Sequence, residues 1–309
     1  MKKIKLLIDT DIGDDIDDAF ALLLAMKMQV EIIGITTVFK NTVERARIAK
    51  KILKLYSDGY DTVPVLAGFS SLLQGAPEAK EHLCQYSSDI EDNAYTPDET
   101  NSEKAVDFII DSCKKYGKDL TILAIGPFTN IARAIEKDRD ALNKCRNIVI
   151  MGGAYYKQYS DWNVICDVES AKYMFDNLEN IKCIGADVTH RVRISEADDK
   201  VILNPSDNPL MKYISKLYLA WKNSSNGALA VLHDPLALYY AIDPSVCTTE
   251  EAEIAVCTEG YARGLTLNVN AYGKKRYNDA YLNSRLNKQT VAKEVDTEKI
   301  ISAFIKCFK

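Results

Sequence analysis

The sequence lacks features that would point to several common classes of protein. It has no apolar run long enough to span a membrane, because the run at 19–26 is followed by Lys27 and then Glu31. It has no excess of basic residues either, since 39 Lys and Arg stand against 44 Asp and Glu, for a formal net charge of -5. Such a chain offers no basic surface that could follow a phosphate backbone. We therefore expect neither a nucleic-acid partner nor a membrane contact.

Closely spaced cysteines are also missing. The eight cysteines are spread along the chain without a C-x-x-C pair, and several lie inside apolar patterns, as expected of buried thiols in a reducing compartment. The chain begins MKKIKLLIDTD, where the apolar run stops at Asp9 and is too short for the hydrophobic segment of a signal peptide. These absences lead us to expect a cytoplasmic protein.

What the sequence does contain is an alternation of strand and helix patterns over its first 190 residues, which is typical of βα units that build a parallel sheet. We expect one α/β domain over residues 1–309, with an open, mostly parallel sheet flanked by helices. The polar segment 85–101 has no periodicity and predicts a long surface loop of the kind that borders active sites. Predicted strands span 4–8, 30–38, 63–67, 120–125, 147–151 and 182–188. Predicted helices span 17–28, 42–56, 102–116, 127–137, 168–177, 209–222 and 297–308.

The most unusual segment is LLIDTDIGDDIDDAFAL, which contains six aspartates within ten residues directly after the first predicted strand. One or two carboxylates would be explained by a helix start, where they cap the helix and interact favourably with its dipole. Six crowded carboxylates repel one another at neutral pH, and a hard divalent cation that prefers oxygen ligands would compensate them. No Cys or His lies in the cluster, so zinc is disfavoured. The six are Asp9, Asp11, Asp14, Asp15, Asp17 and Asp18.

Other polar residues follow the later predicted strands. In open α/β sheets, ligands bind beyond the carboxyl ends of the strands, so these residues should meet the aspartates. Asn41 ends GITTVFKN, and Asp161, Trp162 and Asn163 follow IVIMGG by a few residues. Each amide alone would fit a cap or turn equally well. Their position beside the acidic segment favours a role in binding a substrate.

Histidine is scarce, and one of the three stands out. His233 and Asp234 precede Pro235 in VLHDPLALYY, at the start of a predicted helix. The pair would offer one more hard ligand and one acid–base group at neutral pH, although an Asp at a helix start can also be a simple cap. For His190, in ADVTHRV, we expect a structural role.

Taken together, these motifs resemble the inosine-uridine preferring nucleoside hydrolases along nearly the whole chain. The resemblance rests on DTDIGDDIDDA, GITTVFKN, VPVLAG, AIGPFTN, IVIMGG with DWN, DVTH, HDP and YARGLT, in that order. It implies a Rossmann-like nucleoside hydrolase fold, a homodimer or homotetramer, and one Ca²⁺ at the carboxyl edge of the sheet. It also implies ligands for that ion: the carboxylates of Asp11, Asp18 and Asp234 and the backbone carbonyl of Ile125.

Two departures from the family pattern are visible. The opening motif has two extra residues between Gly13 and the D-D-A that we align to Asp17, Asp18 and Ala19, so that Asp14 and Asp15 lie in an inserted turn. A role for Asp15 near the metal stays open. At Asp161 the family more often has Glu, and the asparagine that it usually carries a few residues earlier is missing from AYYKQYS. Both changes concern the 5′ side of the ribose and leave the cleavage chemistry unaffected.

The implied reaction is hydrolysis of the N-glycosidic bond of a ribonucleoside through an oxocarbenium-like transition state. Asp11 would be the general base for a metal-activated water, and His233 would protonate or hydrogen-bond the leaving base. Tyr218 and Trp221 fit either a mobile segment over the substrate or a buried helix stripe. The residues expected to bind the substrate are Asp17, Asn41, Asp161, Trp162, Asn163 and His82.

Two other classes of protein fit parts of the sequence. A Mg²⁺-dependent phosphohydrolase also opens with D-x-D after a strand, but it needs a downstream Lys and a Ser/Thr phosphate site without a clear counterpart here, and it leaves HDP unexplained. A nucleoside-binding protein without turnover would be expected to have lost Asp11 or His233, and both are present.

Overall fold

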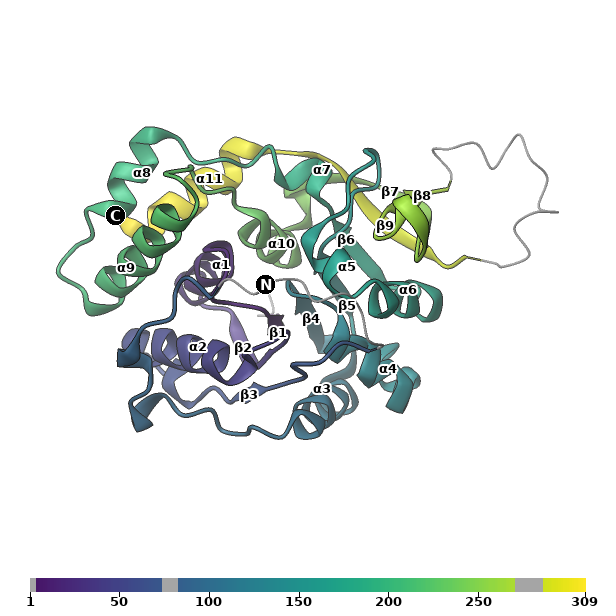
Figure 1. The fold of residues 1–309 in the computed structure, drawn as a ribbon, viewed down its shortest axis with the longest axis horizontal. Coiled ribbons are helices and arrows are strands. Elements are labelled where there is room, and N and C mark those ends of the chain that lie inside the picture. Colours follow the sequence, from purple (N-terminus) through teal and green to yellow (C-terminus); the bar gives the residue numbers. More distant parts are fainter. Residues whose placement is uncertain (1–3, 74–82, 270–285) are drawn as a thin grey trace.

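The computed structural model describes residues 4–73, 83–269 and 286–309 (Figure 1). Within these ranges nine strands form one sheet in the order β3-β2-β1-β4-β5-β6-β9-β7-β8. The strands are β1 (Lys5–Thr10), β2 (Glu31–Thr37), β3 (Val65–Ala67), β4 (Leu120–Ala124), β5 (Asn147–Met151), β6 (Ile181–Ile184), β7 (Cys247–Val256), β8 (Thr266–Asn268) and β9 (Lys288–Val295).

Most of this sheet is parallel. The first six strands pair in parallel in the order 3-2-1-4-5-6, and β9 joins β6 in parallel. The remaining strand pairs, β7 with β9 and β7 with β8, are antiparallel. The expected α/β fold with an open, mostly parallel Rossmann-like sheet is therefore confirmed.

Helices cover both faces of the sheet, and the strand residues alternate between two hydrophobic cores. On β1, Leu6 and Ile8 pack into the core that also contains α1, α2, α9, α10 and α11. Leu7 points to the opposite core, against α3, α4 and α6. This two-sided burial explains why the strands read as continuous apolar runs. The helices are α1 (Asp17–Lys27), α2 (Thr42–Tyr56), α3 (Ser102–Tyr116), α4 (Thr129–Leu142), α5 (Trp162–Cys166), α6 (Val168–Asn177), α7 (Ala186–Thr189), α8 (Glu196–Leu203), α9 (Pro209–Ser224), α10 (His233–Ile242) and α11 (Thr297–Ile305).

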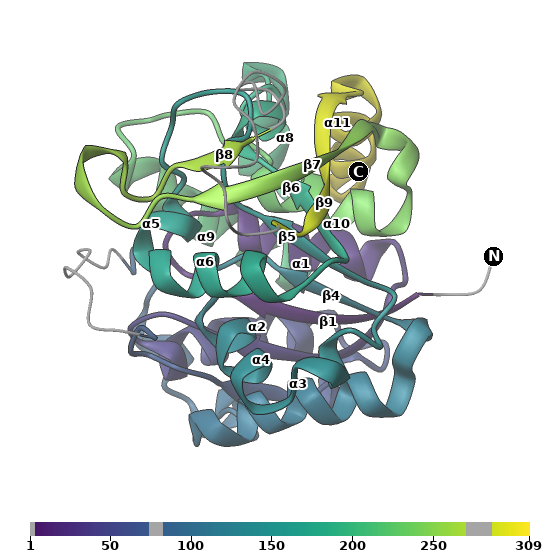
Figure 2. The same ribbon diagram turned by 90° about the vertical axis from the view of Figure 1, so that its right-hand side faces the viewer.

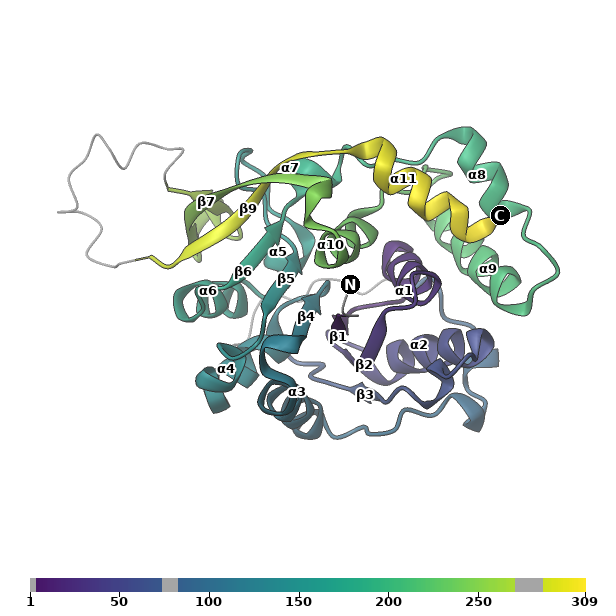
Figure 3. The same ribbon diagram turned by 180° about the vertical axis from the view of Figure 1, so that it is seen from behind.

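The last third of the chain extends the sheet and closes one end of the molecule. Figure 2 shows β7 and β9 crossing the top of the parallel strands, and Figure 3 shows α11 beside α8 and α9. Phe20 of α1 contacts Phe304 of α11, with ring centroids 4.8 Å apart, so the last helix packs on the first. These elements therefore belong to the same packed structure as the parallel strands.

The secondary structure differs from the prediction in a few places. The predicted strand 182–188 is wrong in its second half, because β6 ends at Ile184 and α7 begins at Ala186. Gly185 lies at this change of direction, where an added Cβ would be 2.8 Å from the Tyr155 ring. Short helices α5 and α8 were not predicted, and a 3₁₀ turn, Lys306–Phe308, replaces the end of the predicted last helix. The predicted loop 85–101 contains two 3₁₀ turns, Ser88–Ile90 and Asn93–Tyr95.

Candidate active site

The acidic segment lies at the carboxyl edge of the parallel sheet, between β1 and α1. Thr10 ends β1, and Asp17 and Asp18 open α1. Asp11, Asp17 and Asp18 are each no more than 5% exposed, so these carboxylates are buried rather than solvated. An acidic first turn of an ordinary surface helix would stay in water, and the burial therefore sets this segment apart from a simple helix cap.

Asp234 joins this segment from the far end of the chain. It lies in the first turn of α10, is 2% exposed, and its backbone N–H donates to Asp17 Oδ2 at 3.2 Å. Carboxylate oxygens of Asp17, Asp18 and Asp234 all lie within 4.8 Å of one another. Three buried carboxylates at this spacing form a set of hard oxygen ligands suited to a divalent cation.

The electrostatics of the cluster support the same conclusion. Burial raises the pKa of Asp18 from 3.8 to about 7, and the hydroxyl of Thr10, which donates to Asp18, opposes this shift. Burial and the neighbouring carboxylates raise the pKa values of Asp11, Asp17 and Asp234 well above their ordinary range. Charged carboxylates therefore repel one another here unless a cation is bound. The residues present fit a metal ion.

Asp9 differs from the other aspartates of the segment. Its Oδ1 accepts hydrogen bonds from Thr36 Oγ1 at 2.6 Å and from Asn130 Nδ2 at 2.7 Å, and it does not line the cavity described below. Burial raises its pKa to about 7. Asp9 thus connects three elements of the sheet edge rather than facing a ligand.

A second group of polar residues comes from the start of α5. Asp161 caps this helix, and the Asn163 N–H donates to its Oδ1 at 3.1 Å. Asn163 Nδ2 donates to the carbonyls of Ile125 at 2.9 Å and Met151 at 3.1 Å, which links the ends of two neighbouring strands. Burial raises the pKa of Asp161 to about 6. Trp162 is 44% exposed and projects beside this group.

His233 lines the site from the start of α10, next to Asp234 in the sequence. Its Nδ1 lies 2.6 Å from Thr189 Oγ1, and its ring packs against that of His190 with centroids 5.1 Å apart. Tyr159 extends this row, 5.5 Å from His190. Burial, with smaller contributions from His190 and Arg193, lowers the pKa of His233 from 6.5 to about 3. Its imidazole is therefore neutral at physiological pH in the ligand-free protein.

These groups face one cavity of about 260 Å³. The structure brings together in it most of the predicted site residues from separate elements. It also adds His190, for which the sequence indicated only a structural role, and Tyr159, which was not singled out. The cavity is lined by Asp11, Asp14, Asp15, Asp17, Asp18, Ile125, Met151, Tyr159, Asp161, Trp162, Asn163, His190, His233 and Asp234.

Gly126 and Gly153, which follow β4 and β5, each allow a close approach, but to different parts of the structure. A Cβ on Gly126 would be 2.8 Å from the backbone N of Asp11, so this glycine allows the acidic loop to approach β4 closely. A Cβ on Gly153 would instead meet Tyr155 and Thr266 at 2.7 and 2.8 Å. Gly153 therefore allows close packing of Tyr155 and Thr266 on the backbone.

Some predicted residues lie elsewhere. Asn41 is exposed, immediately precedes α2, and is not among the residues that line the cavity. His82 lies outside the described residues. Tyr218 is fully buried and its hydroxyl donates to Asp199 at 2.6 Å, so it belongs to the core and not to a mobile segment.

The fold and the site together define an α/β enzyme with a buried acidic centre. The sequence matches the family described as inosine-uridine preferring nucleoside hydrolase over residues 6–302. It is 32% identical to uridine nucleosidase 1 of Arabidopsis thaliana, over 96% of this chain and 90% of that protein. It is 30% identical to the inosine-uridine preferring nucleoside hydrolase of Crithidia fasciculata, over 82% and 83%. The chain therefore belongs to the nucleoside hydrolase family and is an N-ribosyl hydrolase that acts on ribonucleosides.

Solved structures agree with this assignment. A plant nucleoside hydrolase superposes with a TM-score of 0.82 at 26% identity, covering 99% of this chain and 98% of the other. A purine-preferring ribonucleoside hydrolase from Gardnerella vaginalis gives a TM-score of 0.76 at 29% identity and 98% coverage of both chains. The phosphohydrolase and the binding protein without turnover are both disfavoured by these similarities. Across the described ranges, no helix combines the length and the apolar character needed to cross a membrane.

Proposed function

We propose that this protein hydrolyses the N-glycosidic bond of purine or pyrimidine ribonucleosides in a Ca²⁺-dependent reaction, releasing ribose and the free base. The observation that carries the proposal is the single cavity that unites the cluster of Asp17, Asp18 and Asp234 with Asp11 and His233. A cation site and a neutral acid–base group that line one cavity suit a substrate with a sugar at one end and a base at the other.

The residues proposed to hold Ca²⁺ are Asp11, Asp18, Asp234 and the carbonyl of Ile125. That carbonyl already accepts a hydrogen bond from Asn163, and its second lone pair is available for a cation. Asp17 shares the cluster with Asp18 and Asp234, so its proposed contact with a ribose hydroxyl would lie directly beside the ion. When bound, Ca²⁺ would orient the ribose hydroxyls and acidify a water molecule.

Asp11 is proposed to take the proton from the attacking water. Its carboxylate lines the cavity, and close packing of Gly126 on its backbone fixes where it stands. The neighbouring carboxylates would stabilise positive charge that develops on the sugar. Asp161, Trp162 and Asn163 would position the ribose from α5, which supplies the orientation needed for attack. Asn41 and His82 are kept as proposed substrate contacts.

The departing base is proposed to receive a hydrogen bond from His233. Thr189 Oγ1 and His233 Nδ1 are hydrogen-bonded, and we propose the tautomer in which Thr189 donates and the ring proton stands on Nε2, the other nitrogen. Because the imidazole is neutral, it would act as a hydrogen-bond donor to the leaving base rather than as a preformed imidazolium. His190 packs beside it and Tyr159 packs beside His190, and this row offers aromatic surfaces for a flat base.

The direct test uses inosine and uridine as substrates and measures the reducing sugar that is released. We expect ribose release with Ca²⁺ present, loss of activity after exhaustive chelation, and recovery when Ca²⁺ is added back. Absence of ribose release from a panel of purine and pyrimidine nucleosides would refute the proposed activity. Full activity after chelation would refute the metal assignment alone.

The proposal also covers the domain organisation, the oligomeric state and the cellular role of the protein. We propose a single catalytic domain, a homodimer or homotetramer, and a role in nucleoside salvage in the cytoplasm. The family resemblance supports these properties, and the position of the last helix against the first supports the single domain. Light scattering of the purified protein would test the oligomeric state, and a monomer at working concentrations would contradict it.

A further inference from the structure

Arg45 is a fully buried arginine beside the acidic segment, and the sequence pattern did not single it out. It lies in the first turn of α2, and its side chain is 0% exposed. A guanidinium is unfavourable in a protein interior unless its donors are paired. The acceptors of its hydrogen bonds therefore indicate which part of the structure Arg45 stabilises.

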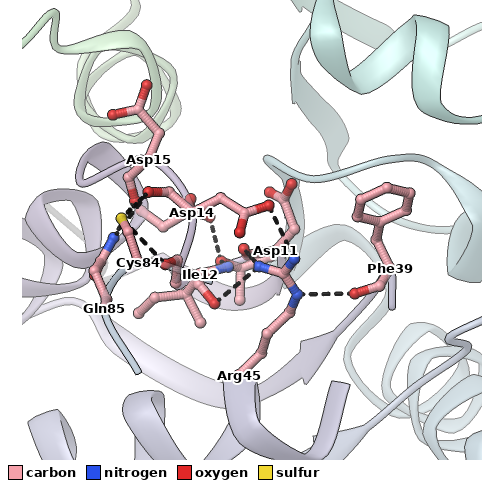
Figure 4. A network of polar contacts seen from close by, with 11 residues as sticks. Asp11, Ile12, Asp14, Asp15, Phe39, Arg45, Cys84 and Gln85 are labelled. Carbon is pink, nitrogen blue, oxygen red and sulfur yellow. Dashed lines mark hydrogen bonds and ion pairs between the residues drawn. The ribbon is translucent and has the colours of Figure 1, made fainter. Parts of the chain in front are cut away.

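The partners belong to the two loops that follow β1 and β2 (Figure 4). Arg45 Nε donates to the carbonyl of Phe39 at 2.8 Å. Nη1 donates to the carbonyls of Asp11 and Ile12, the latter at 3.1 Å, and Nη2 pairs with Asp14 Oδ2 at 3.0 Å. Three of these acceptors are backbone carbonyls, so the guanidinium fixes the path of the chain as well as compensating a charge.

The turn between Asp11 and Asp17 needs such support, because helix α1 reaches back to its last residue, where the Phe20 N–H donates to the Ile16 carbonyl at 3.1 Å, and the carbonyls before Ile16 need other partners. Its other side is held by Cys84 and Gln85. The Gln85 N–H donates to the Gly13 carbonyl at 3.1 Å, and Cys84 Sγ donates to the Asp14 carbonyl at 2.9 Å. The turn is thus fixed between Arg45 on one side and residues 84–85 on the other.

The loop after β2, which supplies the Phe39 carbonyl, also has an unusual backbone conformation. Phe39 and Lys40 both have left-handed backbone angles, with φ of 72° and 56°, which non-glycine residues seldom adopt. The Phe39 ring packs edge-on against Trp162 of the cavity wall, with centroids 6.4 Å apart. Arg45 therefore connects the acidic turn to the loop that supports the α5 side of the site.

We propose that Arg45 is a positioning residue for the metal site, which holds the turn at 11–16 so that Asp11 and the Asp17–Asp18 pair face Asp234. This inference rests on the proposed function, because it assumes that the cluster binds Ca²⁺. Arg45 acts through the backbone and through Asp14, and it does not line the cavity itself.

Two roles for a buried cation beside a metal site predict opposite results. If Arg45 only compensated negative charge, its removal would leave a more negative cluster and Ca²⁺ would bind more tightly. If Arg45 positions the turn, its removal lets the ligands separate and Ca²⁺ binds more weakly. Loss of a residue that orients metal ligands typically weakens binding by about 10- to 100-fold. The direction of the change therefore distinguishes the two roles.

The experiment measures Ca²⁺ affinity by calorimetry on the metal-free protein, for the wild type, Arg45→Met and Arg45→Lys. Arg47→Met is the matched control, because Arg47 lies on the same helix but donates to the carbonyls of Ile90 and Asp92. We expect a Kd raised about 10- to 100-fold in Arg45→Met. Arg45→Lys keeps the charge but not the planar fork, so its Kd should also rise. Arg47→Met should stay within about threefold of the wild type, as expected of a residue outside the network.

Activity provides the second readout. In Arg45→Met, kcat/KM for inosine should fall at low Ca²⁺ and recover in large part when Ca²⁺ is saturating. Unchanged or tighter Ca²⁺ binding in this variant overturns the inference. If Arg45→Met does not fold, Arg45→Lys decides alone, and full wild-type affinity in that variant overturns it. A wild-type protein that binds no Ca²⁺ would instead refute the metal site in the proposed function.

Discussion

The hydrogen bond between Thr189 and His233 leads to a prediction that depends on the leaving group. Replacing His233 by Ala removes the proposed donor to the departing base, and Thr189→Val removes only the hydroxyl that orients it. A purine or pyrimidine anion is a poor leaving group and needs that donor in the transition state. A nitrophenolate does not. Both substrates share the ribose and the metal site, so comparison of the two isolates the contribution of His233.

The size of each effect follows from the contact that is lost. Loss of a positioned proton donor lowers kcat about 10²- to 10⁴-fold, which is the range we expect for His233→Ala on inosine. Thr189 Oγ1 lies 2.6 Å from His233 Nδ1, and one buried neutral hydrogen bond contributes about 0.5–1.5 kcal/mol. At about 1.36 kcal/mol per tenfold in rate, Thr189→Val should slow inosine hydrolysis about 2- to 13-fold. Thr189→Ser keeps the hydroxyl and should restore most of the rate.

The assay compares kcat/KM for inosine and for p-nitrophenyl riboside in the three variants. We expect the losses on inosine to be absent on p-nitrophenyl riboside, where the rate stays near that of the wild type. Equal losses on the two substrates would show that His233 only positions the ribose. The donor would then be His190, which packs beside His233 in the cavity, or Tyr159, which packs beside His190.

Three further predictions concern the acidic centre. Asp234→Ala should abolish Ca²⁺ binding and ribose release together, because it removes one carboxylate of the cluster; calorimetry that still detects a tight site would exclude this role. Asp11→Asn should lower kcat about 10²- to 10⁴-fold while a ribose analogue still binds, and a near-normal kcat would move the base elsewhere, with Asp15 the next candidate. Because burial raises the pKa of Asp18 from 3.8 to about 7, the folded metal-free protein retains a proton that the unfolded chain has lost. This stabilising contribution is complete below about pH 4 and is lost as the pH rises toward about 7, so the Tm of chelated protein should fall over that range and Ca²⁺ should reduce the fall.

Much of the fold and the location of the site could be predicted from the sequence, because both depend on local patterns. The alternation of apolar strands and amphipathic helices predicted the parallel sheet, and α2, α3 and α6 have the predicted bounds. The acidic segment directly after β1 had to lie at the carboxyl edge of that sheet, since every parallel strand of βα units ends at the same edge. The boundary errors fall where tertiary packing overrides the pattern, as at Gly185.

The tertiary structure alone decided which side chains meet at that edge. Asp17 and Asp234 are 217 residues apart in sequence, and only the packing of α10 on α1 brings them into one cluster. Other tertiary contacts hold Asp9 on Thr36, place Thr189 against His233, and bury Arg45 in the loop network. A sequence pattern gives the element on which a residue lies. The direction in which its side chain points depends on neighbours that the pattern does not contain.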